Sequence, residues 1–240
     1  MDNRYQWCIA AIPGKAWAKK VFPELRTSAA VEKLWEAILS AARIDEDPIA
    51  AWEAHNANLQ ARCDYLNNLN IVKLHYTASN GTDFTVTLTP YSKFGMRAPD
   101  KAIKFHANIP SEEICTAPEK YGAEGVIYSS RPLVLGGKSV ENFGFRFEKG
   151  KVVEVIAEEG KEMLEALVAM DENSGYLGEV ALVDYHSPIS MSGIVYYTTL
   201  IDENASCHLA LGRALGRPLP EDSPWTLNDA VIHIDFMVGT

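Results

Sequence analysis

The stretch GFRFEKGKVVEVIA, residues 144–157, indicates the fold class of this chain. Two runs of aromatic and β-branched residues flank Lys149-Gly150, a pair that favours a hairpin turn between antiparallel strands. Similar short apolar runs predict further strands at residues 71–77, 83–89, 104–107, 125–129, 178–184, 194–199 and 231–238. The region after residue 70 is therefore expected to be rich in strands, with one helix over residues 159–170.

Helical spacing dominates the part of the chain before residue 70. Between residues 28 and 43 the apolar side chains recur three and four positions apart, as on one face of a helix. A second helix is expected after Asp47-Pro48, because proline suits the first helical turn. We therefore predict a mixed α+β fold, with a helical segment over residues 1–70 followed by a strand-rich domain over residues 71–240.

The composition narrows the class of protein. The chain has 240 residues, of which 47% are hydrophobic and 22% charged, so it is expected to fold into a globular protein. Its net charge of -10 argues against a nucleic-acid partner, which selects for basic surfaces. The four cysteines are scattered and form neither a zinc-ribbon pattern nor a disulfide framework. No stretch resembles a signal peptide or a membrane span, so a cytoplasmic protein with no membrane partner is expected.

Carboxylates and histidines gather in four short clusters with apolar or small neighbours. The clusters are Ser111-Glu112-Glu113, Gly178-Glu179, Asp202-Glu203-Asn204 leading to His208, and His233-Ile234-Asp235. Charged side chains are rare in such surroundings unless they are paired or bound to a cation. The sequence therefore predicts one dinuclear metal site, of the kind found in metallohydrolases.

The last cluster makes the most specific geometric prediction. In a strand, residues two apart point to the same face, so His233 and Asp235 would project together while Ile234 and Phe236 enter the core. Such a pair suits two ligands of one metal. The alternative is a structural histidine–aspartate pair that binds nothing.

The other three clusters also have simpler interpretations. Asp202 could cap a helix in which His208 lies between one and two turns further on. Ser111-Glu112-Glu113 has the pattern of a capped helix start, with its acids at the positive end of the dipole. Glu179, directly after Gly178, could be a solvated strand end.

Four segments in order resemble one known family. Residues 108–118, 177–183, 202–212 and 233–239 are similar to the bacterial metallo-aminopeptidases typified by aminopeptidase T, aminopeptidase S and PepS. The resemblance continues upstream and spans nearly the whole chain, although family members are longer at both ends. It implies a cytosolic homodimer with two divalent cations, which removes N-terminal residues from peptides that have a free amino terminus.

The resemblance also implies roles for particular residues. The family's metal-binding pattern falls on Glu113, Glu179, Glu203, His208, His233 and Asp235. Zinc or cobalt is the expected metal, and oxygen and imidazole ligands also suit manganese or magnesium. In this hypothesis a metal-activated water attacks the peptide bond, and Glu179 or Glu203 accepts its proton as the catalytic base.

One position departs from the family pattern. Family members carry a tyrosine seven residues after the motif histidine, and this chain has Leu215 there. The departure favours an alternative function, a non-catalytic metal-binding homologue or fragment that acts as an oligomeric binding protein. A phosphoesterase is disfavoured, because the chain has no glycine-rich phosphate loop and no arginine cluster. The six retained ligand types favour the enzyme.

Overall fold

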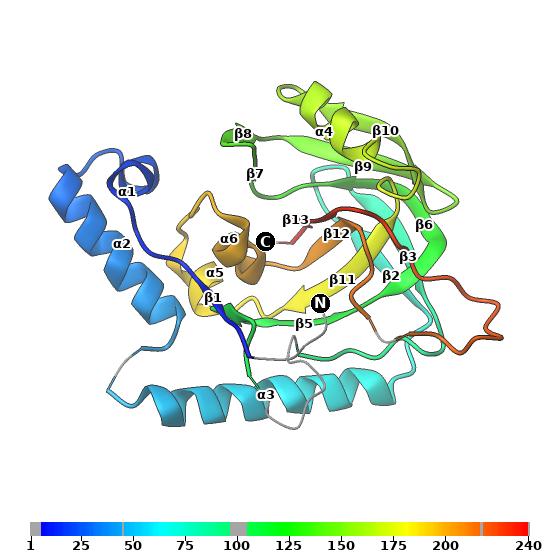
Figure 1. Ribbon diagram of the computed structural model, residues 1–240, viewed down its shortest axis with the longest axis horizontal. Coiled ribbons are helices and arrows are strands. Elements are labelled where there is room, and N and C mark those ends of the chain that lie inside the picture. Colours follow the sequence, from blue (N-terminus) through cyan, green and yellow to red (C-terminus); the bar gives the residue numbers. More distant parts are fainter. Residues whose placement is uncertain (1–5, 45, 97–104, 217, 240) are drawn as a thin grey trace.

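Two antiparallel sheets contain most of the strands in the computed structural model, which describes residues 6–44, 46–96, 105–216 and 218–239 (Figure 1). The larger sheet has the order β10-β9-β6-β3-β2 and the smaller sheet the order β13-β12-β11-β5. The larger sheet comprises β2 (Lys73–Thr77), β3 (Asp83–Leu88), β6 (Pro118–Tyr128), β9 (Phe143–Glu148) and β10 (Lys151–Ala157). The smaller sheet comprises β5 (Glu113–Thr116), β11 (Leu177–Val183), β12 (His208–Gly212) and β13 (His233–Met237).

An apolar core lies between the two sheets. Phe145 and Phe147 of β9 pack there with Val180 of β11, Leu209 of β12 and Phe236 of β13. The rings of Phe145 and Phe236 meet edge to face, with centroids 5.1 Å apart. Full burial of side chains of this size contributes about 1.5–3 kcal/mol each. This packing commits one face of the smaller sheet to the core and leaves the opposite face for polar side chains.

The predicted hairpin at Lys149-Gly150 is confirmed. β9 and β10 pair in antiparallel register across this turn, with Lys151 opposite Glu148. Both turn residues have positive φ, 50° at Lys149 and 83° at Gly150, as a two-residue hairpin loop of the favoured twist requires. A Cβ at Gly150 would lie 2.2 Å from the carbonyl oxygen of Lys120, so only glycine fits there.

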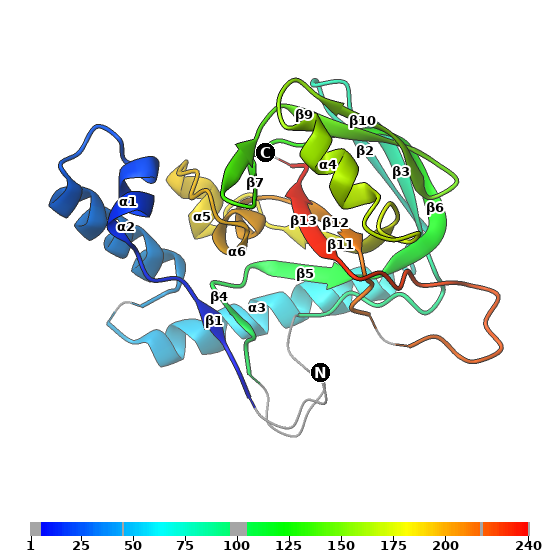
Figure 2. The ribbon, with the colours of Figure 1, turned by 45° about the horizontal axis from the view of Figure 1, so that its top comes forward.

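Helices lie around the sheets at the left, along the bottom and at the top of Figure 1, and Figure 2 gives a second view of them. The helix predicted after Asp47-Pro48 is present, and the Asp47 carboxylate caps it by accepting a hydrogen bond from the Ala50 N–H at 3.1 Å. None of the helices among the described residues is long and apolar enough to cross a membrane. The helices are α1 (Lys15–Val21), α2 (Thr27–Ala41), α3 (Pro48–Asn68), α4 (Lys161–Val168), α5 (Pro188–Ser192), α6 (Thr199–Asp202) and the 3-10 turn η1 (Glu203–Ala205).

The amphipathic pattern of residues 28–43 corresponds to α2, whose buried face completes a second core. Leu34 and Ile38 of α2 pack in one cluster with Ile189 of α5 and Ile201 of α6. α3 instead packs against β5, where Leu59 and Cys63 meet Ile114. The mixed α+β class is therefore confirmed, and the division into residues 1–70 and 71–240 stays a prediction.

Two predicted strands are wrong. The first is the strand expected over residues 104–107. Lys104 lies outside the described residues, and residues 105–107 are irregular. The strand in this region starts later, at Asn108, where β4 (Asn108–Ile109) pairs in parallel with β1 (Ile9–Ala10). At 194–199 the chain is also irregular until α6 begins at Thr199. There the N–H groups of Tyr196 and Thr198 donate to the Asp202 carboxylate, at 2.9 and 3.0 Å, instead of to a neighbouring strand. A small hairpin of β7 (Leu133–Leu135) and β8 (Lys138–Val140) completes the strands described.

Candidate metal centre

The face of the smaller sheet that points away from the core carries the acidic and imidazole side chains. Pairing places Ala210 of β12 opposite both Glu179 of β11 and Asp235 of β13. Because side chains alternate along each strand, and Val180, Leu209 and Phe236 enter the core, Glu179, His208 and Asp235 point to the other face. The small side chains of Ala181 and Ala210 leave space between them.

His233 and Asp235 share this face, as the two-residue period predicts. His233 Nε2 lies 3.4 Å from Asp235 Oδ1 and 3.5 Å from Glu179 Oε2. One donor atom from each of these three residues lies within 4.8 Å of the other two. The other ring nitrogen, His233 Nδ1, lies 2.7 Å from the Arg213 carbonyl oxygen, which orients the imidazole towards the carboxylates.

His208 is the second imidazole of the cluster and is fully buried. Its Nε2 lies 2.8 Å from Glu113 Oε2 and 3.6 Å from Glu179 Oε1, while its Nδ1 lies 3.3 Å from the Ser206 carbonyl oxygen. Burial lowers the pKa of His208, but its contacts with Glu113 and Glu179 outweigh burial and hold the pKa well above its ordinary value. Burial likewise lowers the pKa of His233, and the neighbouring Asp235 reverses this and raises it.

Glu203 joins the cluster from the 3-10 turn η1, with His208 and Asp235 donor atoms within 4.8 Å. The alternative that Asp202 caps a helix containing His208 is wrong. α6 ends at Asp202, η1 ends at Ala205, and His208 begins β12. The capped helix start at Ser111-Glu112-Glu113 is also wrong, since Glu113 begins strand β5 and pairs with Val183. Glu179 is no solvated strand end, because only 2% of its surface is exposed.

Backbone contacts hold the ligand-bearing segments in place. A Cβ at Gly178 would lie 2.4 Å from the carbonyl oxygens of both Gly212 and Arg213, so glycine allows β11 to approach β12 closely just before Glu179. The register shifts at this point, between Leu177 and Glu179, as expected of a β-bulge that re-aims a side chain.

The loop after α2 and helix α3 support the start of β5. The guanidinium of Arg43 forms a two-pronged ion pair with the carboxylate of Glu112, in which Nη2 lies 2.9 Å from Oε2. The side chain of Glu112 is only 5% exposed, so this charge is paired where water cannot solvate it. His55 of α3 contacts the carbonyl oxygen of Ser111 at 2.7 Å and so fixes the residue that precedes Glu112.

The structure brings all six predicted ligands into three overlapping groups. Glu179 and Asp235 each belong to two of them, so the groups form one continuous cluster. The groups are Glu113, Cys115 and Glu179; Glu179, His233 and Asp235; and Glu203, His208 and Asp235.

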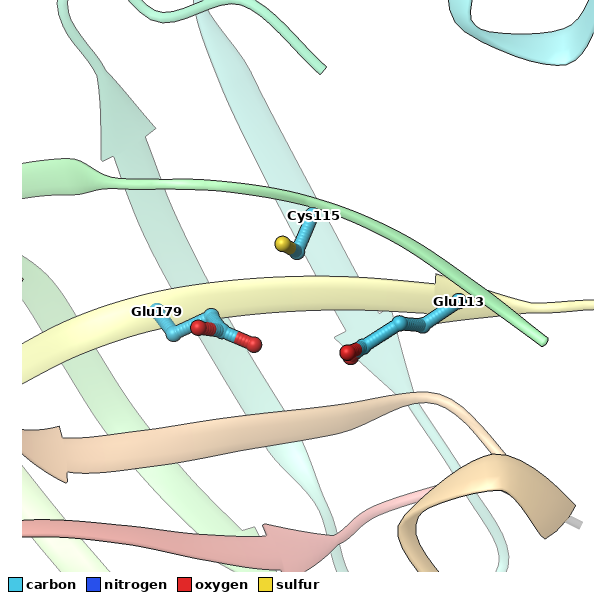
Figure 3. A group of neighbouring side chains, drawn as sticks. All are labelled: Glu113, Cys115 and Glu179. Carbon is cyan, nitrogen blue, oxygen red and sulfur yellow. The ribbon is translucent and has the colours of Figure 1, made fainter. Parts of the chain in front are cut away.

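Sequence reasoning missed Cys115, whose sulfur lies within 4.8 Å of a carboxylate oxygen of Glu113 and of Glu179; Figure 3 shows the three side chains. The available signal was its position two residues after Glu113, which places both side chains on one face of a strand. The alternative helix start at this segment would turn the two side chains to different faces. Leu215 lies in the irregular segment after β12, and 58% of its surface is exposed.

The donor set fits divalent cations. Glu113, Glu179, Glu203 and Asp235 are each 6% exposed or less, and carboxylates gathered in a buried space repel one another unless positive charge lies between them. Oxygen and imidazole donors are those that zinc, cobalt and manganese accept. An α+β protein with this buried carboxylate–imidazole cluster belongs to the class of candidate metalloproteins.

Comparison with known proteins gives the family. The family model described as thermophilic metalloprotease (M29) matches residues 1–240, and the chain belongs to this peptidase family. The chain is 41% identical over 251 residues to aminopeptidase 2 of Geobacillus stearothermophilus, and 44% identical over 243 residues to aminopeptidase T of Thermus aquaticus. These alignments cover 100% and 98% of the chain but only 60% and 59% of the relatives, so the chain spans about three fifths of their length. The resemblance inferred from the sequence is confirmed.

Solved structures agree with this assignment. The structure described as wild-type AmpT from Thermus thermophilus superposes with a TM-score of 0.88 at 41% identity, covering 98% of this chain and 59% of that one. A 2,5-dihydroxypyridine dioxygenase from Pseudomonas putida superposes with a TM-score of 0.52 at 14% identity, over 75% of this chain and 53% of that one. The second likeness concerns the fold alone.

Proposed function

We propose that this chain acts as an aminopeptidase that holds two divalent cations and removes N-terminal residues from peptides. The observation that carries the proposal is that Asp235 belongs to two donor groups, each with its own histidine, because a shared carboxylate is what holds two metal ions side by side. Membership of a metalloprotease family supports the same chemistry. The substrates are peptides with a free amino terminus, as in the aminopeptidases to which the chain is similar.

The groups suggest which residues hold each ion. His233, Glu179 and Asp235 would hold one ion, and His208, Glu203 and Asp235 the other. Glu113, which lies beside His208 Nε2, would complete the site. The carbonyl oxygens of Ser206 and Arg213 keep the two imidazoles oriented, which is the usual role of partners behind metal-bound histidines. Zinc or cobalt is the proposed metal, and manganese or magnesium would also accept this donor set.

The chemistry divides between the ions and the protein. When bound, divalent cations supply the Lewis acidity that polarises a peptide carbonyl and makes water a nucleophile at neutral pH. A carboxylate of the chain must accept the proton that the attacking water loses, and Glu179 and Glu203 are the proposed bases. We further propose a cytoplasmic homodimer, which light scattering and fractionation would test.

A second candidate function is metal binding without turnover, in an oligomeric binding protein. The observation that favours it is Leu215, which stands where the family resemblance places a tyrosine. An exposed leucine offers neither a proton nor a hydrogen bond to a reacting group. In this case the metal cluster would stabilise the fold or a partner interface.

Release of the N-terminal residue from leucyl and arginyl peptides distinguishes the two functions. Metal-free protein would be assayed before and after addition of zinc or cobalt, with N-acetylated peptides as the control. The aminopeptidase proposal predicts metal-dependent release from free peptides only. Tight uptake of metal without release would instead support the binding protein.

A further inference from the structure

Cys115 lies beside Glu113 and Glu179 at one end of the cluster of candidate metal ligands. It comes from β5, two residues after Glu113, so both side chains point to the same face of the sheet. Figure 3 shows Cys115 and Glu113 extending from β5 and Glu179 extending from the neighbouring strand β11. Its sulfur and one oxygen from each glutamate lie within 4.8 Å of one another.

The strand register explains why these three donors meet. Cys115 pairs with Ala181 of β11, and Glu179 is the next residue on the same face of that strand. A diagonal neighbour across two strands is within reach of a long side chain such as glutamate. Since Ala181 has only a Cβ, nothing in its side chain separates the sulfur from the carboxylates.

The backbone at Cys115 is fixed on its other edge. Its N–H donates to the Gly95 carbonyl oxygen and its carbonyl oxygen accepts from the Gly95 N–H, both at 2.9 Å. The neighbouring side chain, Ile114, is buried against α3. Cys115 therefore has one rotatable side-chain bond on a fixed backbone, so few positions are open to its sulfur.

We propose that Cys115 is a metal ligand, which joins Glu113 and Glu179 around one divalent cation of the centre. The inference rests on the metal centre proposed above and deepens it by adding a sulfur to its oxygen and nitrogen donors. Binding forms a metal–sulfur bond and releases the thiol proton to solvent. Donors around a tetrahedral zinc ion are roughly 3.5 Å apart, given metal–sulfur and metal–oxygen bonds of about 2.0–2.3 Å. Small side-chain movements within the present spacing would reach this geometry.

A sulfur ligand has a consequence for metal choice. Thiolate is a soft ligand that favours zinc and cobalt, whereas magnesium and manganese prefer oxygen donors. The structure thus assigns Cys115 a part in selecting zinc or cobalt. The replacement Cys115→Ser should lower zinc affinity by at least about tenfold and change manganese affinity far less.

Cobalt provides a direct spectroscopic test, because a cobalt–thiolate bond gives a near-ultraviolet charge-transfer band that oxygen and nitrogen ligands do not give. Metal-free full chain would be titrated with cobalt and its spectrum recorded, alongside Cys115→Ser and Cys207→Ser. Cys207 is the matched control, because it is next to His208 in sequence but packs on the core side, where its sulfur approaches the Val183 carbonyl oxygen at 3.8 Å.

The expected result is a charge-transfer band in the wild type and in Cys207→Ser, and its loss in Cys115→Ser while the visible cobalt bands remain. Those visible bands show that the variant is folded and still binds cobalt. Wild-type protein that binds cobalt without the band, or Cys115→Ser that keeps it, would overturn the inference and leave the metal centre standing. A wild type that binds no cobalt would overturn both.

Discussion

The backbone N–H of Glu112 donates a hydrogen bond to the side-chain Oδ1 of Asn204, at 2.6 Å. Glu113 follows Glu112 in the chain and Glu203 precedes Asn204, and both glutamates belong to the cluster of candidate metal ligands. Asn204 is 1% exposed, and its Nδ2 donates to the Leu200 carbonyl oxygen at 3.1 Å. One buried amide therefore fixes the start of β5 relative to η1, and with them two of the proposed ligands.

Replacement of this amide should weaken both stability and metal binding. Asn204→Ala leaves the buried Glu112 N–H without its acceptor, which costs about 1–3 kcal/mol of unfolding free energy. Zinc affinity should also fall by roughly tenfold, as is typical when a supporting partner is lost. Urea unfolding and calorimetric zinc titration would measure the two effects. Asn80→Ala, which removes an acceptor in an exposed turn, is the control; an equal effect of both variants would contradict the positioning role.

The close approach of β11 and β12 at Gly178 leads to a second prediction. Gly178→Ala places a Cβ against two backbone carbonyl oxygens, which cannot move aside as the end of a flexible side chain could. Overpacking of this kind lowers the free energy of unfolding by about 1–3 kcal/mol. The clash should also push β11 away from β12, which would move Glu179 and lower the affinity for zinc. Gly95→Ala is a matched control, because Gly95 also pairs with the smaller sheet and a Cβ there would meet nothing within 4 Å. Chemical unfolding that gives equal stabilities for the two variants would refute the packing argument.

Glu179 should be required for turnover. Glu179→Gln keeps the size of the side chain but removes its negative charge and its ability to accept a proton. Hydrolysis of a leucyl peptide should fall by at least about 10²-fold, while circular dichroism stays unchanged. The metal content separates the two proposed roles, because loss of metal indicates a ligand and retained metal indicates the base. The same comparison with Glu203→Gln assigns the other carboxylate, and unchanged turnover in Glu179→Gln would sink the assignment.

Restoring a phenol at position 215 tests whether the leucine limits catalysis. Leu215 is largely exposed, so Leu215→Tyr should be accommodated without loss of stability. If a hydroxyl near the cluster assists the reaction, turnover should rise by about tenfold or more, since one such donor is worth about 10²–10³ in favourable cases. Leu215→Phe, which adds the ring without the hydroxyl, controls for packing. A tyrosine variant no faster than the phenylalanine variant would show that the hydroxyl contributes nothing.

Local patterns in the sequence predicted the parts of the fold that depend on local geometry. The hairpin at Lys149-Gly150 follows from its turn residues, and helix α2 follows from apolar spacing along one short segment. The common face of His233 and Asp235 follows from the two-residue period of a strand. In each case the physical cause lies within a few residues, so the sequence alone contains it.

The wrong predictions concern segments whose structure depends on residues far away in the sequence. Residues 194–199 are rich in β-branched and aromatic side chains, yet the buried Asp202 carboxylate takes the N–H groups that a neighbouring strand would bind. β5 has only four residues, and its pairing with β11 decides against the helix that its acidic start suggested. Cys115 was missed for the same reason, because its proximity to Glu179 depends on that pairing. The family resemblance implies six ligand positions, which stay a prediction, and contains no information on this sulfur.

The metal content of the chain tests the central claim most directly. Metal-free wild-type protein and Asp235→Asn would be dialysed against buffered zinc, and bound zinc and protein counted by elemental analysis and absorbance. Asp83→Asn, which alters an exposed carboxylate on the other sheet, is the control. Two zinc ions per chain in wild type and control, and fewer than one in Asp235→Asn, is the predicted result, because Asp235 belongs to two donor groups. A wild type that retains no zinc, or an Asp235→Asn variant that retains two ions, would contradict the dinuclear centre.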